Sequence, residues 1–178
     1  MTKPELRKAI RTRLASLSEE ERAAKSAAIC REIAASDEWA AGRTVGFFSP
    51  LASEPNVDLL WAVLGARTVC YPRIDGDNLV FILVPSRAAL LESRWNLLEP
   101  PHREDAVVPL EELDLLLVPG LAFTPGRHRM GRGKGFYDRL LSRPALRATS
   151  FGVCFAPQIV PHLPTEEHDQ PVTRLVFA

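Results

Sequence analysis

The sequence predicts an α/β fold in which helices cover a mixed, mostly parallel sheet. Short apolar runs typical of buried strands, such as residues 44–49 and 115–118, alternate with segments that have helical periodicity. A strand, loop and helix followed by another strand occurs at 44–71 and again at 115–155. Repetition of this unit is typical of parallel strands with helices on the faces of the sheet. An Asp-Gly turn at 75–78 indicates an antiparallel hairpin that extends the sheet.

Length and composition limit the classes of protein that remain. The chain has 178 residues, which fit one domain, and we expect residues 1–178 to form it. Lys plus Arg and Asp plus Glu are both 22, so no net charge attracts nucleic acid or an anionic membrane. Nothing in the sequence indicates an obligate protein partner.

The compartment is predicted from the cysteines and the apolar runs. The three cysteines form no CxxC pair and are odd in number, which argues against a disulfide framework or a structural zinc site. No apolar run approaches the ~20 residues that a membrane span needs, and the N-terminus lacks the apolar core of a signal peptide. We therefore expect a cytoplasmic protein with reduced, buried thiols.

Two helices are predicted at the N-terminus. The first has a capping box at residues 2–5, with Pro4 in its first turn, and apolar residues at helical spacing from Leu6 to Leu17. A second capping box at 18–21 starts another helix that runs to about Ile33. We expect the two helices to be antiparallel.

The middle of the chain is predicted to supply the first strands. Residues 44–49 form a buried strand ended by Pro50, and a loop at 51–56 leads to a short helix capped by Asn56. Strands follow at 68–71 and 79–84, on either side of the Asp-Gly turn. We expect a short helix at 86–91 and a proline-bearing loop at 95–102.

A glycine-rich loop is the strongest functional signal. The apolar strand 115–118 stops at a Pro-Gly pair, and a loop rich in glycine and basic residues leads to a helix at about 136–141. Glycines expose backbone amides, and a helix N-terminus adds partial positive charge, so the segment predicts an anion site. The loop contains the glycines Gly126, Gly131, Gly133 and Gly135 and the cations Arg127, Arg129, Arg132 and Lys134, and Asp138 follows as a candidate magnesium ligand. A buried strand at 149–155 and a final apolar stretch at 172–177 complete the chain.

Common alternatives for this loop do not fit as well. Arg132 stands where the Walker loop requires lysine, and no Ser or Thr follows to hold magnesium. The glycine spacing GxGxG also differs from the dinucleotide fingerprint GxGxxG. A solvated turn remains the plain alternative, but clustered cations repel one another unless an anion is present. The four histidines lack close metal-ligand spacing.

Glu54 is predicted to share a crevice with the glycine loop. In parallel sheets ligands bind beyond the carboxyl ends of the strands. The loop that contains Glu54 follows the strand at 44–49, and the glycine loop follows the strand at 115–118. Two loops of this kind meet at the same edge of a sheet.

The glycine loop, taken with other segments, resembles a known family. The segments 119–123 and 129–138, together with Gly126, are similar to the signature of the 5-formyltetrahydrofolate cyclo-ligases, also called methenyltetrahydrofolate synthetases. The resemblance extends over nearly the whole chain: it includes 3–7, 10–11, 17–22, 53–55, 95–96, 99–100 and 168–169.

The resemblance implies a three-layer α/β/α fold and a reaction. Members of the family use ATP and magnesium to close 5-formyltetrahydrofolate to 5,10-methenyltetrahydrofolate, with release of ADP and phosphate. By similarity, ATP would contact Lys3, Pro4, Glu5, Leu6, Arg7, Arg129, Met130, Gly131, Arg132, Gly133, Lys134, Gly135, Phe136 and Tyr137. Arg132 and Lys134 would also be catalytic, and Asp138 would hold Mg²⁺. Glu54 would bind the reduced folate, with Ser49 as a further candidate.

Two departures from the family pattern raise a rival interpretation. Thr173 stands where relatives usually have a second magnesium-binding aspartate, and Thr124 stands where an aspartate is common. Magnesium often takes one or two carboxylates plus phosphate oxygens, so the loss of one ligand need not prevent binding. Asp169 is an alternative ligand if the register shifts. A non-catalytic folate- or nucleotide-binding relative is therefore the rival, and an RNA-binding module is a weaker one because aromatic residues do not interleave the basic loop.

Overall fold

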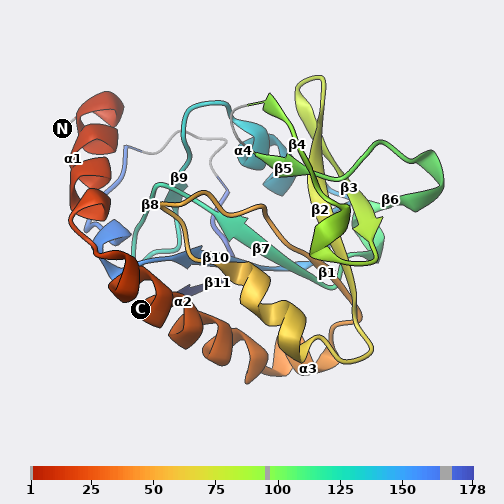
Figure 1. Cartoon of the computed structure of the whole chain (residues 1–178). Coiled ribbons are helices and arrows are strands. Elements are labelled where there is room, and N and C mark those ends of the chain that lie inside the picture. The colour runs from red at the N-terminus through yellow and green to blue at the C-terminus, as the bar shows by residue number, and fades with distance from the viewer. Residues whose placement is uncertain (1, 95–96, 165–169) are drawn as a thin grey trace.

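A seven-stranded sheet forms the centre of the molecule in the computed structural model, which describes residues 2–94, 97–164 and 170–178. Its strands stand in the order β11-β10-β7-β1-β2-β3-β6 (Figure 1). All pairs from β11 to β2 are parallel, whereas β3 is antiparallel to β2 and to β6. The strands span Thr44–Gly46 (β1), Thr68–Asp75 (β2), Asn78–Val84 (β3), Val107–Val108 (β6), Leu115–Pro119 (β7), Thr149–Cys154 (β10) and Arg174–Phe177 (β11). The prediction of a mixed, mostly parallel sheet is confirmed.

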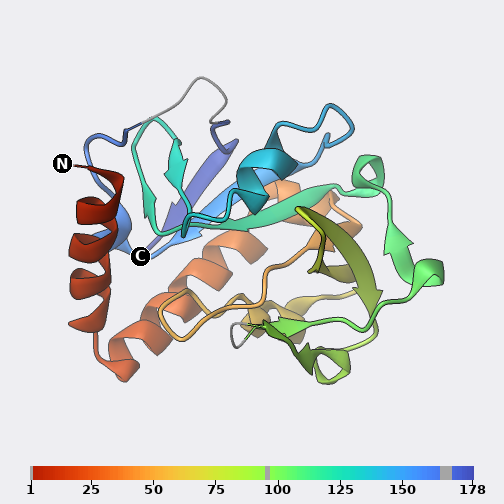
Figure 2. The same ribbon diagram turned by 90° about the horizontal axis from the view of Figure 1, so that it is seen from above.

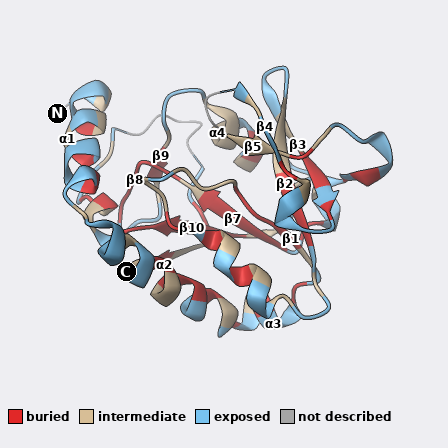
Figure 3. Cartoon of the chain, viewed as in Figure 1, coloured by how far each residue is buried: buried red, intermediate tan, exposed pale blue. Residues whose placement is uncertain are grey.

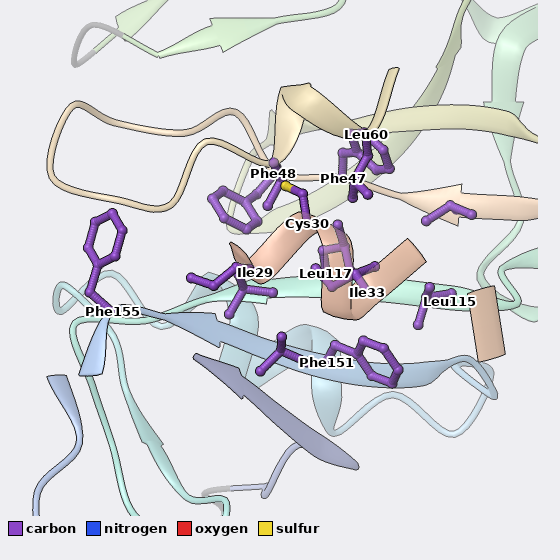
Figure 4. Close-up of a cluster of buried hydrophobic side chains, with 14 of the residues drawn as sticks. Ile29, Cys30, Ile33, Phe47, Phe48, Leu60, Leu115, Leu117, Phe151 and Phe155 are labelled. Atoms are coloured by element: carbon purple, nitrogen blue, oxygen red, sulfur yellow. The ribbon is translucent and has the colours of Figure 1, made fainter. Parts of the chain in front are cut away.

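Helices cover both faces of this sheet. Alternate side chains of β7 point to opposite faces. Leu115 and Leu117 join the core cluster that contains Ile29 and Ile33, and Leu116 and Val118 join a second cluster beneath α4. Figure 4 shows the first cluster between α2 and the sheet. The buried strands lie between partly exposed helices in Figure 3, so the three-layer arrangement is confirmed.

The N-terminal helices begin at the predicted capping boxes. They span Lys3–Ala15 (α1), Glu19–Ala34 (α2) and Asp37–Ala41 (α3), and α4 spans Phe136–Leu141. In the first box the Thr2 hydroxyl accepts from the Glu5 amide, and the Glu5 carboxylate accepts from the Thr2 amide. Ser18 and Glu21 form the same two hydrogen bonds at the start of α2. None of the described helices is long and apolar enough to cross a membrane.

The expected antiparallel pairing of α1 and α2 is wrong. In both Figures 1 and 2, α2 turns away from the direction of α1 and runs along the sheet. Each helix buries its apolar stripe elsewhere: α1 packs against the 3₁₀ segment η6 (Ala156–Gln158), and α2 packs against η1 (Val57–Val63) and β11.

Several short elements differ from the sequence prediction. The strand β1 ends at Gly46, although the Phe47 amide still donates to the Cys70 carbonyl (2.9 Å). Asn56 caps η1 as predicted, by accepting from the Asp58 amide (3.2 Å). Among the described residues, further 3₁₀ segments span Arg87–Ala89 (η2), Glu104–Ala106 (η4) and Leu110–Glu112 (η5).

Two small hairpins were not predicted. The short helix expected at 86–91 is present as η2, and the strand β4 (Leu91–Glu92) that follows it pairs with β5 (Leu98–Glu99), where a loop was expected. Residues 95–96 between them lie outside the described part of the chain. The strands β8 (Ala122–Phe123) and β9 (Arg129–Met130) pair inside the glycine-rich segment. Both hairpins lie beside the site described next.

The order of the strands creates a crevice between β1 and β7. From β1 the chain continues to β2, β3 and β6 on one side of the sheet, and it then returns to β7, β10 and β11 on the other side. The loops that follow β1 and β7 therefore leave in opposite directions. In open α/β sheets this switch point is where ligands bind, outside the carboxyl ends of the strands.

Candidate functional site

A cavity of about 300 Å³ lies at the switch point. Phe48 and Ser49, just beyond β1, form part of its wall, and Pro119 and Gly120 at the end of β7 form another part. The size lies at the lower end of the range that is usual for small-molecule sites, and the wall is largely apolar with a few charged groups.

The glycine loop forms the charged side of this cavity. Gly131, Arg132, Lys134 and Gly135 line it. Gly133 has a φ of 108° and Gly135 a φ of 70°, in the left-handed region that side chains other than glycine rarely adopt. The chain can therefore turn tightly and bring backbone amides next to a ligand.

The helix that follows the loop contributes less than the sequence suggested. The helix α4 has only six residues, which is less than two turns. A helix this short has few aligned peptide dipoles, so its macrodipole adds little to the affinity of its N-terminus for an anion. The loop amides and the basic side chains are the main anion-binding groups that the geometry offers.

Arg129 and Asp138 form an ion pair at the wall of the cavity. The Nη2 of Arg129 donates to Oδ1 of Asp138 (2.6 Å). The Arg129 side chain is 3% exposed and that of Asp138 is 27% exposed, so the carboxylate is the more accessible member. Arg129 also lies 5.4 Å from the centre of the Tyr137 ring. The arginine therefore fixes the orientation of a carboxylate that faces the cavity.

A second ion pair joins the two loops that surround the cavity. Arg132 donates through Nε and Nη2 to Oε1 of Glu54 (3.0 and 2.9 Å), and its Nη2 also lies 3.1 Å from the Ser53 hydroxyl. The other Glu54 oxygen accepts from the Leu51 amide (3.0 Å). The Glu54 side chain is 8% exposed. Both of its oxygens are thus held in place at the point where the two loops meet.

The opposite wall of the cavity was not predicted from the sequence. The β2 strand extends five residues beyond Cys70, which pairs with the last residue of β1, and it brings Pro72 and Ile74 to the cavity. The Ile74 amide donates to Oε1 of Glu99 (3.1 Å), and the Leu98 amide donates to the Ser49 hydroxyl (3.2 Å). The first bond ties the β4–β5 hairpin to β2, and the second ties it to the segment that follows β1. The sequence predicted this strand only at 68–71, so the extension of β2 to Asp75 that forms the wall was missed.

Tyr137 places a buried hydroxyl near the charged groups. It is a lining residue, and among the described residues its hydroxyl has no hydrogen-bond partner. Burial, and next the negative charge of Glu54, raise the pKa of this phenol, while Arg129 acts in the opposite direction. The hydroxyl therefore stays protonated and can act as a donor.

The N-terminal segment reaches the glycine loop through Arg7. Its Nε donates to the Gly131 carbonyl (3.2 Å). The other N-terminal candidates lie in the first turns of α1 and do not line the cavity: Glu5 closes the capping box, Leu6 is buried in the core, and Lys3 and Pro4 start the helix. Of the loop candidates, Met130 is buried in the core, and Gly133 lies next to the Arg7 guanidinium. Ser49, Glu54, Phe136 and Asp138 line the cavity.

The structure gives Thr173 a role outside the cavity. Its hydroxyl accepts from the Ser150 amide (3.1 Å), and its carbonyl accepts from Arg127 (2.8 Å). It is not one of the residues described as lining the cavity. The alternative ligand Asp169, and with it His168, lies outside the described residues.

The described residues contain no group of three or more His, Cys, Asp or Glu side chains that could hold a metal by themselves. Asp138, which lines the cavity, is the residue predicted to hold the metal. This arrangement fits Mg²⁺, which keeps several waters and often binds through one or two carboxylates together with phosphate oxygens of a substrate.

A family model supplies the identification. The model described as the 5-formyltetrahydrofolate cyclo-ligase family matches residues 1–178. The chain belongs to the 5-formyltetrahydrofolate cyclo-ligase family. The resemblance seen in the sequence is thereby confirmed.

Individual cyclo-ligases agree with this assignment. The mouse 5-formyltetrahydrofolate cyclo-ligase is 28% identical over 97% of this chain and 91% of its own length. The enzyme of the same name from Mycolicibacterium smegmatis is 33% identical over 76% of this chain and 73% of its own. The solution structure of 5,10-methenyltetrahydrofolate synthetase from Aquifex aeolicus has a TM-score of 0.87 and 32% identity, and covers 99% of this chain and 90% of that chain.

Proposed function

We propose that the chain closes 5-formyltetrahydrofolate to 5,10-methenyltetrahydrofolate, with consumption of ATP and release of ADP and phosphate. Family membership supports the choice of reaction. The single observation that carries it is the contact of Arg132 with Glu54 (2.9 Å) inside one cavity. A basic glycine loop suited to phosphate and a carboxylate suited to the N–H groups of a pterin ring meet there.

The proposed chemistry has two steps. The formyl oxygen is a poor leaving group, so the terminal phosphoryl group of ATP is transferred to it, and the bond to ADP breaks. The nitrogen at position 10 then attacks the activated carbon and loses its proton to the departing phosphate or to water, and the bond from carbon to the formyl oxygen breaks. Phosphate leaves with that oxygen, and the new carbon–nitrogen bond completes the methenyl ring.

The protein's part in these steps is to position the reactants and offset charge. Phosphoryl transfer depends on alignment and on groups that neutralise the phosphate oxygens. Arg129, Arg132 and Lys134 line the cavity, and Arg129 is paired with Asp138. We assign Arg132 and Lys134 the catalytic role of stabilising the transferred phosphoryl group, and we assign the remaining residues of the loop and the start of α1 to the nucleotide.

The folate half of the site uses Glu54 and the apolar wall. A carboxylate is a good acceptor for the several N–H donors of a pterin ring. Ser49 lies near the same wall, with its hydroxyl already accepting from the Leu98 amide. The neighbouring side chains of Pro72, Ile74 and Leu98 exclude water from the activated formyl group, which would otherwise be open to hydrolysis.

Magnesium is proposed to bind at Asp138. When bound, the ion offsets phosphate charge, as in other phosphoryl-transfer sites. Arg129 keeps one carboxylate oxygen occupied (2.6 Å), so the second oxygen is the one that this residue offers to the metal. Thr173 takes no part in this assignment.

We also propose that residues 1–178 act as one cyclo-ligase-like domain in the cytoplasm. The seven-stranded sheet takes its strands from residues 44 to 177, which supports the proposal of a single domain. All three cysteines are free and buried, which suits a reducing compartment.

The test is an optical assay of the purified protein with 5-formyltetrahydrofolate and magnesium-ATP. The proposal predicts formation of the methenyl product only when ATP is present. Lys134→Ala should lower the rate strongly, whereas the matched control Arg143→Ala, outside the cavity, should not. Absence of an ATP-dependent product would contradict the proposal, and folate binding without turnover would favour the non-catalytic relative.

A further inference from the structure

Two carbonyl groups of the glycine loop accept hydrogen bonds from arginines in different helices. The Gly131 carbonyl accepts from Nε of Arg7 in α1 (3.2 Å), and the Lys134 carbonyl accepts from Nη2 of Arg139 in α4 (3.1 Å). The loop is therefore held near both ends of the segment 131–135. Neither arginine is among the residues that line the cavity.

The direction of these carbonyls determines the direction of the loop amides. A trans peptide is planar, and its C=O and the following N–H point to opposite sides. The described chain has no cis peptide. Because Arg139 holds the Lys134 carbonyl, the Gly135 N–H points away from Arg139, and the Arg132 N–H points away from Arg7 in the same manner. Arg132 and Gly135 both line the cavity. The two arginines thus fix the orientation of two backbone amides that belong to residues lining the cavity.

Arg139 is well placed to hold this geometry. Its Nε donates to the Asp77 carbonyl in the β2–β3 turn (2.7 Å), so one planar guanidinium connects the loop to the hairpin. The guanidinium also lies 5.3 Å from the centre of the Phe136 ring. The φ of 70° at Gly135 favours glycine at this position, and a Cβ there would also lie 2.7 Å from Nη1 of Arg139.

We propose that Arg139 is a positioning residue for the phosphate-binding loop, with Arg7 as its counterpart at the other end. The inference rests on the proposed function, since the anion is a phosphate group of ATP. Arg139 does not touch the nucleotide. It orients the loop amides and the Lys134 backbone that contact the nucleotide, so the loop is already ordered before the nucleotide binds.

The test compares Arg139→Lys with Arg143→Lys, because both variants keep the net charge. Magnesium and a non-hydrolysable ATP analogue are titrated into each full-length protein by calorimetry, without folate. Lysine cannot donate to two carbonyls in a planar fork, so Arg139→Lys should weaken nucleotide binding about tenfold, as expected for the loss of a hydrogen bond from a charged group. Arg143→Lys should bind like the wild type.

A second titration separates positioning from general loss of structure. Affinity for 5-formyltetrahydrofolate and the thermal midpoint of unfolding should stay at wild-type values in Arg139→Lys. In turnover, the KM for ATP should rise while the KM for the folate stays constant. Equal nucleotide affinity in Arg139→Lys and wild type, or an equal loss of both ligands, would overturn the inference.

The outcome is distinguishable from failure of the proposed reaction. Arg139-dependent nucleotide binding in a protein that makes no methenyl product would contradict the reaction and support the inference. Normal turnover together with unchanged nucleotide affinity in Arg139→Lys would contradict the inference alone.

Discussion

The sequence predicts that Asp138 belongs to the site, but it does not predict which side chain contacts this carboxylate. The sequence indicated a carboxylate after a basic loop. It did not indicate that Arg129, one of the loop cations, is a buried partner of that carboxylate (2.6 Å). Burial depends on tertiary packing, so a basic residue in a loop can be read equally well as a solvated ligand or as a structural partner. The same holds for Glu54 and Arg132, which are 78 residues apart in the chain.

Asp138→Asn should lower turnover about a hundredfold, the usual cost of removing one preorganised electrostatic group. Asparagine can still accept from Arg129, so stability should fall by less than the about 3–5 kcal/mol expected when a partner of a buried pair is deleted. Steady-state rates and denaturant unfolding measure the two effects. Asp105→Asn, which changes an exposed pair with Arg103, is the control. Wild-type turnover in Asp138→Asn would remove this residue from the site.

Glu54→Gln should strengthen nucleotide binding and weaken folate binding. In the free protein Arg132 is paired with Glu54, and a phosphate group has to compete with that carboxylate for the arginine. Removal of the carboxylate charge ends this competition and leaves Arg132 available to the phosphate. A gain of about fivefold in nucleotide affinity corresponds to a partly exposed ion pair. Calorimetric titration of each ligand alone checks both changes, with the exposed Glu104→Gln as control. Unchanged nucleotide affinity would mean that the two half-sites are not coupled through this pair.

At the scale of elements, a close contact holds the β8–β9 hairpin against β10 of the sheet. Gly152 in β10 stands against Phe123 of β8, and a Cβ there would lie 2.7 Å from the phenylalanine ring and 2.9 Å from Val172 and Leu175. Only glycine allows this approach. The contact keeps the hairpin, and with it the start of the glycine loop, on the sheet.

Gly152→Ala should destabilise the fold by about 1–3 kcal/mol, the usual cost of overpacking a core. Gly126→Ala is the matched control, because a Cβ there meets its neighbours at ordinary distances of 3.6 and 3.7 Å. Its effect should stay within about 0.5 kcal/mol. Denaturant unfolding gives both values, and equal stability of the two variants would show that β8 does not pack as described.

Which elements were predictable depends on their length. The capping boxes and the apolar runs located α1, α2 and the longer strands, since these signals are local. The β4–β5 and β8–β9 hairpins were not predicted, because strands of two residues are too short to show a hydrophobic periodicity in the sequence. The direction of α2 was also not predicted, because the apolar stripe of a helix does not indicate which element it packs against.

For the whole molecule, the order of the strands places the site. The sequence indicated parallel strands and a crevice at their carboxyl ends, but it did not give the neighbours of each strand. The observed order puts β1 next to β7, and the loops that follow these two strands contain Glu54 and the glycine segment. A different order would have separated the two loops although every element was the same.

Buried thiols make the stability of the whole molecule depend on pH. Burial, and next the charge of Asp58, raise the pKa of Cys30 from 9.0 to about 11, and burial raises the pKa of Cys154 from 9.0 to about 12. Both values are raised in the folded state, so the stabilisation is complete below pH 9.0 and is lost as the pH rises toward 11 and 12. Denaturant unfolding across this window should show a falling free energy of unfolding. A constant or rising value would contradict the burial of these thiols.

The proposed reaction requires that the formyl oxygen is activated by phosphorylation in the cavity between β1 and β7. The most direct measurement uses 5-formyltetrahydrofolate with a heavy oxygen isotope in the formyl group and follows the isotope by mass spectrometry after turnover with magnesium-ATP. The proposed steps predict that the label appears in the released phosphate. Label that is found in water, while methenyl product and unlabelled phosphate accumulate, would contradict them.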